Sequence, residues 1–337
     1  MENKDKQRLI VTGGAGFIGR NFIGLILESR EYYLINIDNL SSGVYDSIKD
    51  LEKDSDYEFI NADIADKEKM LEIIKEGDII VNFAAESHVD NSIKDPSKVV
   101  LNNIAGTLAL LEAARQKGVK KFVQISTDEV YGSLDFNAPS SKEEDNIFSR
   151  NPYSASKAAC EQIALSYHNT FGLPVVVTRS SNNFGAYQFP EKVIPLFATN
   201  LIEGRKVPLY GEGKNVRDWL FVKDNCKAIE VVMNKGEVGK IYNIGAGNEI
   251  SNLELTKKIL GEMRFIGEDA EKMIERVEDR KGHDLRYSLD IEKIKSLGWK
   301  PEKSFIEALR ETIEWYKNNE EWWKPLKDLK DRRTRGI

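Results

Sequence analysis

The stretch Arg8–Gly19 reads RLIVTGGAGFIG, and it decides the fold. Its first five residues are rich in apolar and β-branched side chains and predict a buried strand. Gly13, Gly16 and Gly19 then allow a tight turn, a close approach of the backbone to a pyrophosphate, and close packing of a helix on the strand. The following Phe17–Arg30 predicts that helix, whose first N–H groups and positive dipole end suit phosphates. Strand, glycine loop and helix together predict a dinucleotide-binding unit.

The same alternation of short apolar runs and longer amphipathic stretches continues through the first half of the chain. It is typical of a doubly wound parallel sheet with helices on both faces, an α/β fold of the Rossmann type. The further predicted strands are Tyr33–Asp38, Tyr57–Asn61, Asp78–Phe83, Lys121–Ser126 and Pro174–Arg179. The further predicted helices are Lys67–Lys75, Ser97–Lys117 and Tyr153–Thr170.

After about residue 184 the rhythm changes and predicts a smaller, interleaved C-terminal α/β lobe. Its helical patterns are Val193–Glu203, Val222–Asn234, Leu253–Arg264 and Phe305–Asn318, and Lys240–Ile244 predicts one more strand. We expect 1–183 to form the dinucleotide-binding domain, to which about 222–246 return. We expect 184–221 and 247–326 to form the second lobe and 327–337, with five bases, to be a solvated basic tail.

Composition excludes several classes of protein. The 337 residues carry 49 Lys and Arg against 55 Asp and Glu, a net charge of −6 that argues against nonspecific binding of nucleic acid. Two cysteines make no disulfide framework and favour a reducing compartment. The charged N-terminus is no signal peptide, and no apolar run approaches the ~20 residues that span a bilayer. We therefore expect a cytoplasmic protein that does not enter membranes.

Acidic residues at two strand ends suggest how a dinucleotide is held. Asp38 ends the second predicted strand, where a carboxylate can accept hydrogen bonds from the adenosine ribose and would repel a 2′-phosphate. This favours NAD over NADP, although Asp38 could instead cap a turn. Asp63 follows the third strand and could cap a helix or meet the adenine amino group.

Two pairs of residues are candidates for catalysis. Tyr153 and Lys157 are spaced i,i+4 on one helix face, where the lysine charge would lower the tyrosine pKa and suit it to proton transfer beside a nicotinamide. Asp128 and Glu129 follow the fifth strand, at the sheet edge where ligands bind. They could serve as acid and base, or simply as first-turn carboxylates of a capped helix. No His, Cys and acid cluster has the spacing of a metal site.

Several motifs resemble those of the extended short-chain dehydrogenase/reductases, and within them the dTDP-glucose 4,6-dehydratase family. The resemblance spans roughly residues 8–325, with Ala186 and Lys281 as departures from the usual pattern. Besides the glycine loop, it rests on AAESHVD at 84–90, STDEVYG at 126–132, YSASK at 153–157, SNNFG at 181–185, QFPEK at 188–192, NVRDW at 215–219 and GHDLRY at 282–287.

This resemblance implies a redox-neutral dehydration of a nucleotide sugar with bound NAD. Tyr153, supported by Lys157, would take the proton of the sugar 4-hydroxyl, Glu129 the proton at C5, and Asp128 would protonate the departing 6-hydroxyl, with Thr127 near the sugar 4-position. The residues implied for the NAD site, besides the glycines and the catalytic pair, are Phe17, Ile18, Asp38, Asn39, Leu40, Ser41, Asp63, Ile64, Ala84, Ala85, Asn102 and Asn183. Those implied for the nucleotide sugar are Ser87, Thr127, Asn182, Lys192, Val193, Pro208, Tyr210, Arg217, Asn252, Arg280 and His283.

The resemblance also implies a homodimer. Its interface would be built by the two helices at Ser97–Lys117 and Tyr153–Thr170, and periodicity suggests an apolar face of Leu108, Leu111, Ala158 and Ile163. Three alternatives stay open: a UDP-glucose 4,6-dehydratase, a 4-epimerase or decarboxylase on the same scaffold, and a non-catalytic NAD-binding regulator. Simple epimerisation needs neither acid of the Asp128–Glu129 pair, and a regulator would not need both Tyr153 and Lys157.

Overall fold

The computed structural model describes residues 6–279 and 284–335, and its centre is a parallel sheet of seven strands. The order β10-β6-β5-β4-β1-β2-β3 reverses direction between β1 and β4, which is the switch point where such sheets bind ligands. The strands are β1 (Gln7–Thr12), β2 (Tyr32–Asp38), β3 (Tyr57–Asn61), β4 (Ile79–Asn82), β5 (Lys121–Thr127), β6 (Val175–Ser180) and β10 (Ile241–Ile244). The predicted Rossmann-type fold is confirmed.

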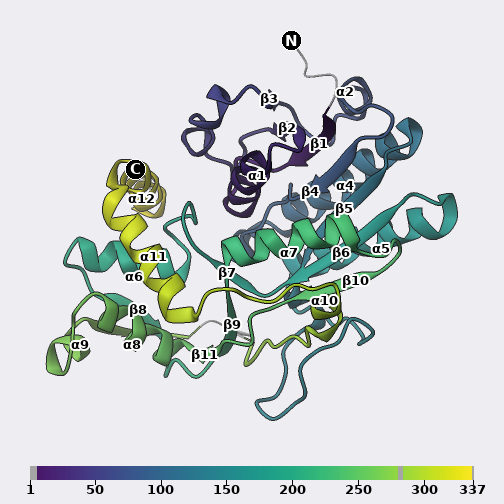
Figure 1. Cartoon of the computed structure of the whole chain (residues 1–337). Helices are drawn as coiled ribbons and strands as arrows, with labels where there is room; N and C mark the ends of the chain where they lie inside the picture. The colour runs from purple at the N-terminus through teal and green to yellow at the C-terminus, as the bar shows by residue number, and fades with distance from the viewer. Residues whose placement is uncertain (1–5, 280–283, 336–337) are drawn as a thin grey trace.

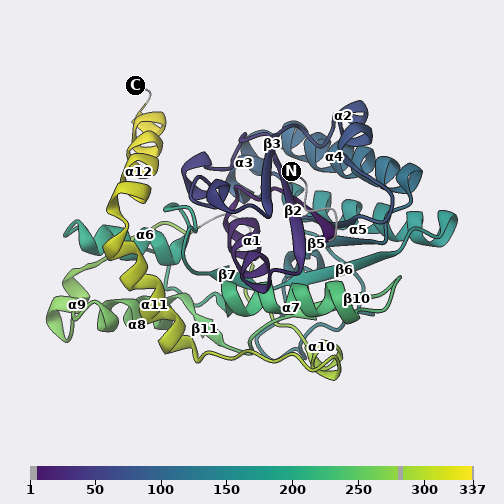
Figure 2. The ribbon, with the colours of Figure 1, turned by 45° about the horizontal axis from the view of Figure 1, so that its top comes forward.

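Helices cover both faces of this sheet (Figure 1). Along β1, Leu9 and Val11 pack toward Phe22 on one face while Ile10 packs toward Leu110 on the other, and all are fully buried. A strand buried on both faces is the reason for the continuous apolar runs in the sequence. One layer holds α1 (Phe17–Ser29), α7 (Val222–Lys235) and α10 (Glu292–Ser296); the other holds α2 (Lys67–Ile73), α3 (Val89–Lys94), α4 (Pro96–Lys117) and α5 (Pro152–Phe171) (Figure 2).

The second lobe has its own core beside the carboxyl ends of the main sheet. Phe184, Trp219, Phe221 and Phe305 lie together in this core, with Phe184 in contact with the other three rings. Its strands are β7 (Asn182–Phe184), β8 (Val207–Tyr210), β9 (Val216–Phe221), β11 (Glu249–Ser251) and β12 (Ile274–Val277), paired as β11-β9-β7 and β12-β8. Its helices are α6 (Val193–Ile202), α8 (Asn252–Glu262), α9 (Glu268–Lys272) and α11 (Phe305–Asn318).

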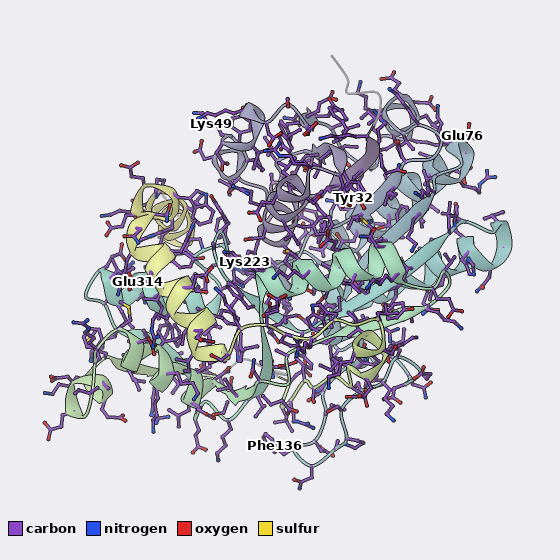
Figure 3. All side chains as sticks on the ribbon, viewed as in Figure 1. Tyr32, Lys49, Glu76, Phe136, Lys223 and Glu314 are labelled. Carbon is purple, nitrogen blue, oxygen red and sulfur yellow. The ribbon has the colours of Figure 1, made fainter. Side chains whose placement is uncertain are left out.

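The two lobes interleave along the chain. After β9, the chain passes through α7 beside α1 and then through β10, which pairs with β6 at the edge of the main sheet. Lys223, labelled in Figure 3 near the start of α7, forms an ion pair of 2.7 Å with Glu311 on α11. This ion pair joins the dinucleotide-binding layer to the second lobe.

The C-terminal segment differs from the predicted solvated tail. Glu320–Arg335 forms α12, which follows α11 directly. Lys327 is only 5% exposed, and its Nζ donates to Thr199 and to Glu203, each at 2.8 Å. Trp323 on the same helix is fully buried. The prediction of a solvated tail is therefore wrong for Lys327, because a buried lysine charge is tolerated where acceptors are at hand.

Within the described residues, no helix is both long enough and apolar enough to cross a bilayer.

Candidate active site

The glycine loop takes the conformation that the sequence predicted. Gly13 has φ +72°, and a Cβ there would lie 2.6 Å from the backbone nitrogen of Ala84, so a larger residue would collide with the end of β4. A Cβ on Gly19 would lie 2.4 Å from the carbonyl oxygen of Gly13. Gly16 is the N-cap of α1 and no side chain caps that helix, which leaves its first turn open to an anion. The loop is therefore built for close backbone approach, as a pyrophosphate requires.

Asp38, at the end of β2, stabilises this loop through hydrogen bonds of its side chain. Its carboxylate accepts the N–H of Ala15 at 3.0 Å and the N–H of Leu40 at 2.8 Å. Burial raises the pKa of Asp38, although these two hydrogen bonds oppose that rise. Each carboxylate oxygen can accept more than one hydrogen bond, so Asp38 keeps acceptor capacity beyond these two bonds. Asp38 therefore does cap a turn, through the N–H of Leu40, and this capping is compatible with a role in binding.

The other residues assigned to the dinucleotide lie around this edge. Asp63 accepts hydrogen bonds from Asn39 at 2.9 Å and from the N–H of Ala65 at 2.8 Å, while Asp66, not Asp63, caps α2. Ile64 packs against α4 at Gly106. A Cβ added to Gly106 would lie 2.9 Å from Cδ1 of Ile64. Ser41 and Asn102 are exposed, Ala84 and Ala85 follow β4, and Phe17 and Ile18 open α1 against the core.

Asp128 and Glu129 form the first turn of a short 3₁₀ helix, Asp128–Tyr131, that follows β5. Thr127 caps this helix by accepting the N–H of Glu129 at 3.3 Å, and its hydroxyl donates to Asp128 at 3.3 Å. Asp128 is 4% exposed and its Oδ2 is buried with no hydrogen-bond partner in the described structure. Burial and the negative charge of Glu129 raise the pKa of Asp128 well above its ordinary value. A carboxyl group that keeps its proton in this way is suited to act as an acid.

Glu129 lies in a different electrostatic environment. Burial raises its pKa, but a hydrogen bond from Asn151 and the positive charges of Lys192 and Arg217 oppose that rise. Asp128 thus has one carboxyl oxygen without a hydrogen-bond partner, whereas Glu129 has neighbours that favour its charged form. The capped-helix alternative describes the backbone correctly, but it leaves the burial of Asp128 at the strand end unexplained.

Tyr153 and Lys157 lie on the first turns of α5, and here one prediction is wrong. We expected Lys157 to lower the pKa of Tyr153. Burial raises the pKa of Tyr153 instead, as do the negative charges of Glu129 and Asp128. Lys157 is 4% exposed, and burial lowers its own pKa. The sequence shows the i,i+4 spacing but not the low-dielectric surroundings, which penalise both charged forms.

Asn151 is a site residue that sequence reasoning missed. Its Oδ1 accepts the N–H of Ser154 at 2.8 Å and so caps α5, while its Nδ2 donates to Oε2 of Glu129 at 3.1 Å. The position before Pro152 and Tyr153 is a signal for a helix cap, since proline is favoured in the first turn. Nothing in the sequence indicates that the same amide reaches a residue 22 positions earlier.

Arg217, assigned by the resemblance to the nucleotide sugar, is buried on β9. Its guanidinium donates to the carbonyl oxygens of Val216 at 2.7 Å and Asp284 at 3.0 Å, and lies 4.3 Å from the centre of the Tyr287 ring. Within the described ranges its hydrogen bonds go to carbonyl oxygens and not to a carboxylate. Its positive charge is therefore available to favour an anion nearby.

The remaining residues assigned to the substrate are distributed around both lobes. Ser87 is exposed after β4, Lys192 and Val193 begin α6, Pro208 and Tyr210 lie on β8, and Asn252 begins α8. Arg280 and His283 lie outside the described residues.

Several residues at or just after the carboxyl ends of β5 and β6 have buried polar atoms without partners. They include Oγ of Ser126, Oδ2 of Asp128, Oδ1 of Asn182 and Oδ1 of Asn183. Buried polar groups are normally satisfied, so such a group of them indicates a place for a polar ligand. Together with the glycine loop and Asp38, the residues present fit a dinucleotide and a second polar ligand. No group of three metal-ligating side chains occurs within the part of the chain that the structure describes.

Comparison with known proteins agrees with this geometry. The family model of GDP-mannose 4,6 dehydratase matches residues 10–312. A dTDP-glucose 4,6-dehydratase from Streptomyces niveus is 46% identical over 95% of this chain and 96% of its own. The low-salt glycan biosynthesis protein Agl12 of Haloferax volcanii is 44% identical over 93% of this chain and 99% of its own.

A solved structure extends the similarity to the fold. DesIV, a dTDP-glucose 4,6-dehydratase from Streptomyces venezuelae solved with NAD and TYD bound, superposes with a TM-score of 0.90 at 43% identity, over 95% of this chain and 100% of its own. The match thus covers both lobes and the elements that carry Asp128, Glu129 and Tyr153. From its sequence, its fold and this site, the chain belongs to the nucleotide-sugar 4,6-dehydratases and, within them, to the dTDP-glucose 4,6-dehydratase family.

Proposed function

We propose that the protein converts dTDP-glucose into dTDP-4-keto-6-deoxyglucose with NAD as a bound cofactor. The observation that carries this function is the pair Asp128–Glu129, a buried acid beside a partly buried one in unlike surroundings, within electrostatic reach of Tyr153. Removal of water across C5 and C6 needs one base and one acid, and this pair offers both. A 4-epimerase needs neither, and a non-catalytic NAD-binding protein does not need Tyr153 together with the buried Lys157.

The chemistry that NAD supplies when bound is a reversible hydride transfer, which makes the sugar C5–H acidic through a 4-keto group and later saturates C6. Tyr153 takes the proton of the 4-hydroxyl and Lys157 supports it from the next helical turn. Glu129 removes the proton at C5, and Asp128 passes its proton to the 6-hydroxyl as water leaves. Thr127 holds both acids in place through its hydrogen bonds with the Glu129 N–H and the Asp128 carboxyl.

The direct experiment is incubation of the purified protein with dTDP-glucose and, separately, with UDP-glucose, followed by identification of the products by mass. We expect a product that is lighter than dTDP-glucose by one water, and no net consumption of NAD. An isomer of unchanged mass would indicate an epimerase. Preferential conversion of UDP-glucose would assign the enzyme to the uracil nucleotide instead.

We propose in addition a homodimer that works in the cytoplasm. Leu101 and Leu108, which lie two turns apart on one face of α4, are 65% and 44% exposed and would be covered by a partner subunit packed against this helix. Two members of the face expected from sequence do not belong to it, since Leu111 and Ala158 are buried in the subunit core. The two free thiols, Cys160 and Cys226, are buried and fit a reducing compartment.

A further inference from the structure

Asn151 connects the two halves of the active site through a single amide group. Its backbone begins α5, two residues before Tyr153, and its Oδ1 accepts the N–H of Ser154 at 2.8 Å. The hydroxyl of Ser154 closes the capping box by accepting the N–H of Asn151 at 3.3 Å. The other end of the amide donates to Glu129 on the 3₁₀ helix after β5, at 3.1 Å.

The orientation of this amide follows from its partners. The N–H of Ser154 can only donate, and an ionised Glu129 carboxylate can only accept. A flipped amide would place its NH₂ group against the N–H and its oxygen against the carboxylate, so neither hydrogen bond could form. The helix cap therefore determines which end of Asn151 points toward Glu129, and the amide is held there before substrate arrives.

We propose that Asn151 is a positioning residue, which holds the Glu129 carboxylate at a fixed place relative to Tyr153 and favours its charged form for removal of the C5 proton. The inference rests on the proposed function, because it assigns Asn151 to the elimination step of that reaction. In the described chain this is the sole hydrogen bond to the Glu129 carboxylate. A base held by one hydrogen bond depends on that bond for its placement.

Other charged and titratable groups also face Glu129. Lys192 and Arg217 favour its ionised form, and Asp284 opposes it. Glu129 in turn raises the pKa of Asp128, Tyr153 and Tyr287, so these groups also lie within its field. Asn151 differs from all of them because it is uncharged and acts through a directed hydrogen bond. Its removal should shift the titration of Glu129 without changing the charge of the site.

The chain allows capping and positioning to be separated. Serine and aspartate cap helices about as well as asparagine, but serine is too short to reach Glu129 and aspartate cannot donate to it. We would compare Asn151→Ser and Asn151→Asp with the wild-type holoenzyme on dTDP-glucose across pH. The readouts are the rate of 4-keto-6-deoxy product, the absorbance of reduced cofactor in the first turnover, and the melting temperature. Ser304→Ala is the matched control, since Ser304 forms the other described capping box, on α11.

For Asn151→Ser we expect product formation to fall about tenfold near neutral pH, as is typical when a charge-assisted hydrogen bond is removed. The acidic limb of its pH profile should move to higher pH, and reduced cofactor should accumulate because elimination has become slow. KM and the melting temperature should stay close to wild type. Asn151→Asp should move the limb further, because a second carboxylate then faces Glu129. Ser304→Ala should lower the melting temperature and leave the pH profile unchanged.

An Asn151→Ser enzyme with the wild-type rate and pH profile would overturn the inference and reduce Asn151 to a helix cap, while the proposed function stands. A loss that follows melting temperature in both Asn151→Ser and Ser304→Ala would overturn it in the same way. Wild-type protein that gives no dehydrated product would overturn the proposed function and this inference together.

Discussion

The carboxylate of Asp38 accepts the backbone N–H of Ala15 across 3.0 Å, so the end of β2 supports the glycine loop that follows β1. The same carboxylate would receive the ribose hydroxyls of NAD. Asp38→Ala should therefore weaken NAD binding by about tenfold or more, because the variant can form neither the charge-assisted hydrogen bond to the loop nor the one to the cofactor. Equilibrium titration with NAD checks this. Asp46→Ala, at a nearby exposed acid, should bind NAD normally; equal affinity of the Asp38 variant would contradict the assignment.

Glu129 and Tyr153 are coupled through their charges. The carboxylate raises the pKa of Tyr153, after burial as the larger cause. Glu129→Gln removes that repulsion, so oxidation at C4 should begin at a pH lower by roughly one unit, while product formation is lost. Stopped-flow absorbance of reduced cofactor against pH measures this shift. Tyr153→Phe should give no reduced cofactor at any pH; if it reduces cofactor at the wild-type rate, the proton acceptor is misassigned.

Asp128→Asn should slow product formation strongly and stabilise the protein at high pH. Losing the acid should slow elimination by at least about 100-fold. Burial and Glu129 raise the pKa of Asp128 in the folded state, so its favourable contribution to folding is present below the unfolded-state pKa and is lost as pH rises through the folded-state pKa. The amide of the variant does not titrate, so the variant does not lose stability in this way as pH rises. Thermal melts should therefore show the variant gaining on wild type as pH rises, and a gain that shrinks with pH would contradict this.

Lys327 should matter to stability although it belongs to the basic C-terminal stretch. Burial raises the pKa of Glu203, but hydrogen bonds from Lys327 and Arg205 outweigh it and lower the pKa overall. Lys327→Met should cost about 2 kcal/mol of unfolding free energy at neutral pH. A carboxyl whose pKa is lowered on folding stabilises the protein at pH values above its unfolded-state pKa. The loss of stability in Lys327→Met should therefore shrink as pH falls through the folded-state pKa of Glu203. Denaturant unfolding at two pH values tests this, with the exposed Lys324→Met as a control expected to cost under about 0.5 kcal/mol.

The proposed dimer predicts that charge on the exposed face of α4 separates the subunits. Leu101→Lys combined with Leu108→Lys should convert a particle of twice the chain mass into a single chain in light scattering. Ile266→Lys, at a side chain 76% exposed in the second lobe, should leave the mass unchanged. A wild-type protein that scatters as one chain at micromolar concentration would exclude the dimer.

The sequence by itself determined the dinucleotide fold and singled out the candidate catalytic residues, whose roles stay predictions. Strands buried on both faces leave continuous apolar runs, and a backbone that must approach a pyrophosphate admits only glycine, as the 2.6 Å approach at Gly13 shows. These requirements act on neighbouring residues, so they produce patterns that can be recognised in the sequence. The short strands of the second lobe, such as β7 and β11 with three residues each, leave no comparable pattern.

Tertiary structure alone decided the electrostatics and the contacts between distant segments. The pKa of Tyr153 rises because of burial and of carboxylates from another strand end, where the spacing to Lys157 predicted a fall. The amide of Asn151 reaches Glu129, and Lys327 reaches Thr199 and Glu203, only because the folded chain brings these segments together. A pKa depends on the dielectric and on every nearby charge, and neither is a property of residues read in order.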